Sequence, residues 1–188
     1  MAQITNSTRS KPKPYRSRGG TFDMRALPES TCISTAVIAY GDVVQFDVNV
    51  ATANHRIVKA SSMANVPNVI STALIGIAVE GSADIGSTIA AGSEGGGSKL
   101  LVCCANKETE FKWPTKATGA QHASSLVGTR RAIGYDSTLS MFYVDVANST
   151  AGDATLVITE VIDAGTTNGA VVAKFLSTNL ARMISGAF

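Results

Sequence analysis

The sequence predicts an all-β protein, a small β-barrel or sandwich of about eight short strands preceded by a flexible N-terminal arm. Short stretches rich in β-branched and other apolar residues recur along the 188-residue chain, separated by Gly, Asn and Asp. Between them we find no stretch of about 10–15 residues with the 3.6-residue period that the helices of an α/β fold require. Charge is also uneven, because the first 20 residues hold five of the 16 basic residues and none of the 14 acidic ones.

Residues 1–20 form the predicted arm, and residues 21–188 form a single β-rich body domain with a net charge of −3. Pro12 and Pro14 favour an extended backbone, and Gly19-Gly20 predicts a flexible joint. A basic arm can dock on an acidic protein surface, neutralise nucleic-acid phosphates, or remain a solvated tail. The arm's candidate partner-binding residues are Arg9, Lys11, Lys13, Tyr15, Arg16 and Arg18.

The first half of the body contains three predicted strands. In residues 40–50, Val44 and Phe46 alternate with Gln45 and Asp47, which is typical of a half-buried strand. Residues 55–60 form a shorter candidate. Residues 74–79 are continuously apolar, as expected of a strand that is covered on both faces.

The second half of the body contains five more predicted strands. A Gly-rich loop at residues 91–98 precedes apolar strands at 99–104, 141–146 and 156–162. Residues 110–113 alternate polar and aromatic side chains, and Pro114 ends that strand. Residues 169–176 favour a closing strand, although residues 171–183 would also suit a short helix. Residues 124–131 or 30–39 have room for one helical turn.

The aromatic residues Phe111 and Trp113 flank Lys112, a pattern found in proteins that stack on single-stranded nucleic acid. The alternative for both rings is packing under a loop or at an intersubunit contact. We therefore add Phe111 and Trp113 to the candidate partner-binding residues.

Nothing in the sequence predicts catalysis, a metal site or a cofactor. His55 and His122 have no Cys, His or Glu at metal-ligand spacing, and the order Gly97-Ser98-Lys99 does not match a phosphate-binding loop. Cys103 and Cys104 follow an apolar run, so we expect small core side chains that diverge on a strand. Asp42 and Asp136 neighbour Gly or Ser, which favours turn capping. No apolar run is long enough to cross a membrane as a helix.

The body resembles the small β-barrel decoration, or cement, proteins of tailed-phage heads. The resemblance covers residues 36–176 and rests on YGDVVQF at 40–46, LIGIAVEG at 74–81 and the Gly-rich connection that follows. It continues through KLLVCC at 99–104, EFKWP at 110–114, LVGTRRAIGYD at 126–136 and the strand at 141–146. The resemblance implies a virion protein without enzymatic activity, which binds the major capsid protein on the outside of the shell, often as a homotrimer. Assembly would take place in the cytoplasm of a bacterial host.

Two other hypotheses compete with this one. A small-virus coat or packaging protein would use the basic arm to contact its nucleic acid, although a charge of +5 is small for neutralising a genome. An enzyme or ligand-binding barrel has no supporting motif, but a fold never excludes a site.

Overall fold

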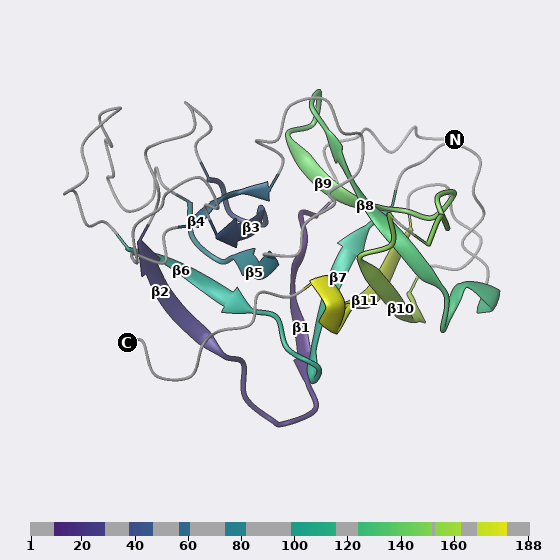
Figure 1. Ribbon diagram of the computed structural model, residues 1–188, viewed down its shortest axis with the longest axis horizontal. Coiled ribbons are helices and arrows are strands. Elements are labelled where there is room, and N and C mark those ends of the chain that lie inside the picture. Colours follow the sequence, from purple (N-terminus) through teal and green to yellow (C-terminus); the bar gives the residue numbers. More distant parts are fainter. Residues whose placement is uncertain are drawn as a thin grey trace, which may run out of the picture.

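The computed structural model describes residues 10–28, 38–46, 57–60, 74–81, 99–115, 124–151, 153–162 and 169–179. Within these ranges lie eleven strands and two short 3₁₀ helices, η3 (Ser124–Leu126) and η4 (Ser177–Asn179). The strands form two antiparallel sheets, which occupy the two halves of the view in Figure 1. The all-β prediction is confirmed.

The larger sheet has six strands in the order β1-β7-β11-β10-β8-β9. Its members are β1 (Lys13–Ser17), β7 (Thr109–Pro114), β8 (Arg130–Asp136), β9 (Met141–Asp145), β10 (Leu156–Val161) and β11 (Ala170–Phe175). A single parallel bridge between Thr115 and Val144 brings the end of β7 to β9. One bridge is not a ladder, and the strands in the described part of the chain do not close into a barrel.

The smaller sheet has five strands in the order β2-β6-β5-β3-β4. They are β2 (Met24–Pro28), β3 (Val43–Phe46), β4 (Ile57–Lys59), β5 (Leu74–Ala78) and β6 (Lys99–Cys104). The chain passes from β1 to β2 and from β6 to β7, and β1 pairs with β7 while β2 pairs with β6. These four strands therefore form one bent antiparallel ribbon that belongs to both sheets.

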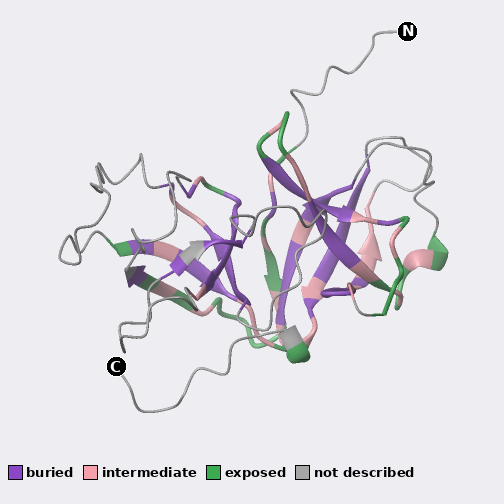
Figure 2. Cartoon of the chain, turned by 45° about the horizontal axis from the view of Figure 1, so that its top comes forward, coloured by how far each residue is buried: buried purple, intermediate pink, exposed green. Residues whose placement is uncertain are grey.

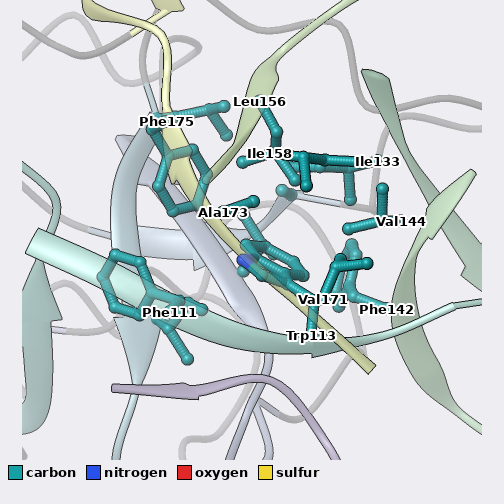
Figure 3. Close-up of a cluster of buried hydrophobic side chains, with 14 of the residues drawn as sticks. Phe111, Trp113, Ile133, Phe142, Val144, Leu156, Ile158, Val171, Ala173 and Phe175 are labelled. Atoms are coloured by element: carbon teal, nitrogen blue, oxygen red, sulfur yellow. The ribbon is translucent and has the colours of Figure 1, made fainter. Parts of the chain in front are cut away.

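The two sheets share a hydrophobic core. Val43 and Cys103 of the smaller sheet belong to the same buried cluster as Phe111, Trp113 and Phe175 of the larger one. The three aromatic rings meet edge to face, with centroids 5.5 Å apart for Phe111–Phe175 and 5.6 Å apart for Trp113–Phe175 (Figure 3). Such contacts add about 0.5–1.5 kcal/mol beyond the burial of apolar area.

A second buried cluster lies on the other side of the smaller sheet. It includes Val44, Cys104 and Leu100, so adjacent residues of β3 and β6 belong to different clusters (purple in Figure 2). This corrects the prediction of a half-buried strand at 40–50 for residues 43–46, while residues 47–50 lie outside the described residues. Gln45, expected on a solvated face, is only 2% exposed because β3 is covered on both faces.

All eight predicted strands are present, and the segment after Gly169 is a strand through Phe175, not a helix. Ser124–Leu126 makes the single helical turn that was one of two options. The additional strands are β1, β2 and β8. The prediction of a flexible arm is wrong for residues 13–17, which pair with β7 as an edge strand of the larger sheet. Prolines are tolerated there because an edge strand pairs on one side only.

Candidate partner-binding surface

The N-terminal segment lies against Gly41, just before β3, and then follows the edge of the larger sheet before it enters β2. Gly41 has φ +82°, and a Cβ atom built on it would lie 2.5 Å from Lys11 Cβ and 2.9 Å from the Pro12 carbonyl oxygen. Only glycine therefore fits beneath the segment at this point. Pro12 is buried there, whereas every residue of β1 itself is half-buried or exposed. The segment is thus anchored at Pro12 and lies on the surface along β1.

Arg16 and Arg18 hold β1 to the sheet through two glutamates. Arg16 Nε donates to Glu110 Oε2, and Arg16 Nη1 lies 2.9 Å from Glu160 Oε2. Arg18 Nη2 lies 3.5 Å from Glu110 Oε1. The Glu110 side chain is 1% exposed, whereas those of Arg16 and Arg18 are 45% and 62% exposed. The hydrogen bond that Arg16 donates to Glu110 raises the pKa of Arg16.

Tyr15 is the exposed aromatic side chain of β1. The register shifts between Pro14 and Arg16, which leaves Tyr15 as a bulged residue without a partner on β7. Bulges re-aim side chains, and Tyr15 is 42% exposed. The Arg16 guanidinium carbon lies 5.5 Å from the centre of the Tyr15 ring. Lys13 is exposed as well.

The exposed apolar residues continue along the ribbon. Phe22 is 37% exposed, and Met24, at the start of β2, is 43% exposed. Three of the five large hydrophobic residues that are exposed in the described part of the chain therefore lie between residues 15 and 24. We call Lys13, Tyr15, Phe22 and Met24 the ribbon surface. Aromatic residues and methionine are enriched at protein–protein interfaces.

The prediction that Phe111 and Trp113 bind a partner is wrong. Both side chains are 0% exposed, and they pack against Phe175 in the shared core (Figure 3). The alternation on β7 turns them inward, which leaves neither ring a face for a nucleobase. Arg9 lies outside the described residues.

A second ion pair is buried where the two sheets meet. Lys59 Nζ lies 2.9 Å from Asp42 Oδ2, with side chains 8% and 1% exposed. The amine also donates to the Tyr135 hydroxyl at 3.1 Å and lies 4.6 Å from the centre of that ring. Burial raises the pKa of Asp42, although the backbone N–H of Ala39 and the Lys59 amine oppose it. This cluster joins β3 and β4 to β8.

The remaining candidates behave as the sequence predicts or lie outside the described residues. Cys103 and Cys104 are buried free thiols in the two different clusters, and burial raises the pKa of each to about 12. Asp136 Oδ1 caps a turn by accepting from the backbone N–H groups of Thr138 and Leu139. His55 and His122 are outside the described ranges. Among the described residues, no three His, Cys, Asp or Glu side chains gather as a metal site.

Sequence reasoning missed Glu110, Glu160 and Lys59. Glu110 precedes the aromatic alternation on β7 and resembles an ordinary solvated strand residue. The available signal was the surplus of arm cations, which need carboxylates somewhere, but composition cannot identify which ones.

Comparison with known protein families, with curated proteins and with solved structures finds no match to this chain. In the part of the chain that the structure describes, no helix is long and apolar enough to span a bilayer.

Proposed function

We propose that this protein is a structural virion protein that decorates a tailed-phage capsid, binding the major capsid protein and bridging neighbouring capsid subunits. The observation that carries the proposal is the ribbon surface, on which Lys13 and three exposed apolar side chains lie on the segment that edges both sheets. Exposed apolar side chains on a segment that also carries an exposed lysine suit a protein partner better than open solvent. We take the major capsid protein as the partner because residues 36–176 resemble decoration proteins.

The edge strand carries features that restrain open-ended strand addition. Pro12 and Pro14 have no N–H to donate, Tyr15 is bulged, and Lys13 is charged. A protein present in many copies needs such protection. We therefore infer that docking uses side chains of the ribbon surface, and that each copy contributes a modest interface which multivalency strengthens.

The alternative, a coat protein whose arm contacts nucleic acid, is weakened by the ion pairs. Arg16 and Arg18 face Glu110 and Glu160, so two of the arm's five cations already have carboxylate partners. The logarithm of nucleic-acid affinity falls by about 0.9 per phosphate contact for each logarithmic unit of salt. The three remaining cations, Arg9, Lys11 and Lys13, would then give a slope of about −2.7 at most.

Cosedimentation with undecorated tailed-phage shells tests the proposal. We expect saturable binding at a fixed number of copies per shell, weakened at least tenfold by the double substitution Tyr15→Ala/Met24→Ala. Val127→Ala is the matched control, because Val127 is 49% exposed but lies away from the ribbon, after η3. Absence of binding to shells, together with salt-sensitive binding to DNA or RNA, would favour the coat-protein alternative.

A further inference from the structure

We propose that the side of β7 that pairs with β1 accepts β1 from a second copy of this chain in place of its own, so that two copies exchange residues 10–17. The inference goes beyond capsid decoration and does not depend on it. It rests on how β1 is attached, on what its departure leaves behind, and on the segment that joins it to β2.

The attachment of β1 is almost entirely polar. The strand contributes backbone pairing with β7 and the arginine–glutamate ion pairs, and none of its five residues is buried. Pro12 is the buried residue of the segment and would be transferred with it. Lys13 lies opposite Lys112, and like charges in that position weaken a strand pair. Releasing residues 10–17 therefore exposes little apolar surface.

The vacated edge cannot readily remain empty. Glu110 is 1% exposed while β1 is in place, and among the described residues its ion-pair partners are Arg16 of β1 and Arg18, which directly follows that strand. While β1 is displaced, Glu110 loses both counter-charges and one side of β7 has unpaired backbone groups, so the vacated edge favours the return of a strand. The edge therefore selects a strand with arginines two residues apart. A second copy supplies that strand by definition.

The connection between β1 and β2 can act as the hinge. Residues 18–22 are all exposed, and two backbone hydrogen bonds hold this connection, 3.0 Å from Gly20 N to Ser17 O within the turn and 3.1 Å from Arg18 N to Glu108 O. A Cβ atom on Gly20 would meet nothing within 4 Å, so the turn is not held by packing. β2 itself is paired with β6 over five residue pairs and stays in place. Exchange of an identical element about such a hinge is an economical route to a dimer.

Mixed-chain disulfide formation tests the exchange. In a Cys32→Ser background, one chain carries Lys13→Cys and the other carries Lys112→Cys, which are register partners on the outer part of the sheet. We expect a disulfide-linked dimer whose yield rises with protein concentration and exceeds the control several-fold. The control pairs Lys13→Cys with Lys107→Cys, an exposed position that does not face residue 13. A single chain with both Lys13→Cys and Lys112→Cys should close internally when dilute.

A hinge-shortened chain gives the second readout. Deleting Gly19 and Gly20 prevents β1 from folding back, so light scattering after size exclusion should find dimers, and removal of residues 1–17 should return them to monomers. A mixed-chain yield no higher than the control would overturn the proposal, as would a monomeric hinge-shortened chain. Failure of the double-cysteine chain to close would refute the register on which the proposal rests. None of these measurements requires a capsid, so they are independent of the proposed function.

Discussion

Glu110 on β7 and Asp42 before β3 have side chains that are equally buried, at 1% exposure, but their cationic partners lie in different surroundings. Arg16 is 45% exposed on a strand that can leave, whereas Lys59 is 8% exposed beneath Tyr135. Solvent screens the first pair and scarcely reaches the second. The same type of carboxylate thus secures a peripheral strand in one place and joins the two sheets in the other.

The substitution Lys59→Met tests the buried Asp42–Lys59 pair most directly. Asp42 would lose its partner inside the junction of the sheets, and we expect a loss of about 3–5 kcal/mol in the free energy of unfolding. The double variant Asp42→Asn/Lys59→Met should recover most of that loss, because no buried charge then remains. Denaturant unfolding measures both. Equal stability of the single variant and the wild type would show that the pair contributes nothing.

Cys103 and Cys104 extend the comparison to buried groups whose pKa is set mainly by burial. Burial raises the pKa of each thiol to about 12, while an unfolded thiol titrates near 8.5. The folded state therefore holds these protons more tightly, and their contribution is complete below pH ~8.5 and lost as pH rises toward about 12. We expect the two thiols to remove about 3 kcal/mol between pH 8.5 and 10.

The matched variant Cys103→Ala/Cys104→Ala isolates this contribution from other groups that titrate at high pH. Its free energy of unfolding should fall less steeply over the same range, whatever its stability at neutral pH. Parallel pH curves for the two proteins would contradict the expectation.

The exposed network should respond more weakly. Arg16→Ala/Arg18→Ala removes both cations from Glu110, but solvent screening limits the expected cost to about 1 kcal/mol, smaller at high salt. Hydrogen exchange of the β1 and β7 amides should quicken while that of the β5 amides stays unchanged. Arg16→Lys/Arg18→Lys keeps the charges and serves as the control.

The body could be predicted from the sequence because its strands are specified locally. Each of the eight predicted strands has its own apolar pattern and its own turn residues. Strand β8 was not predicted because Gly134 and two arginines obscure its apolar pattern. β1 could not be predicted in this way. Its strand state comes from the free edge of β7 and from a buried carboxylate nearly 100 residues away in the sequence.

The residues of the candidate site likewise differ in whether the sequence alone could identify them. Lys13 and Tyr15 were found from composition and are exposed, whereas Phe111 and Trp113 have the same aromatic-basic signature and are core residues. Residue type cannot distinguish these cases, because burial depends on which face of β7 meets the second sheet. Glu110 belongs to the structure of the site only because β1 covers it.

The substitution with the smallest expected effect on stability, Lys13→Ala, distinguishes a role in docking from a role in folding. Lys13→Ala alters an exposed side chain opposite Lys112, so removing it should change the free energy of unfolding by less than about 0.5 kcal/mol, with a slight gain from relieved repulsion. If the ribbon surface is the docking face, the same substitution should still weaken binding to capsid shells and flatten its salt dependence. Lys107→Ala, at another exposed lysine, should leave both properties unchanged. Because β1 remains folded in the variant, unchanged shell binding would remove Lys13 from the docking face without disturbing the strand pairing that places it there.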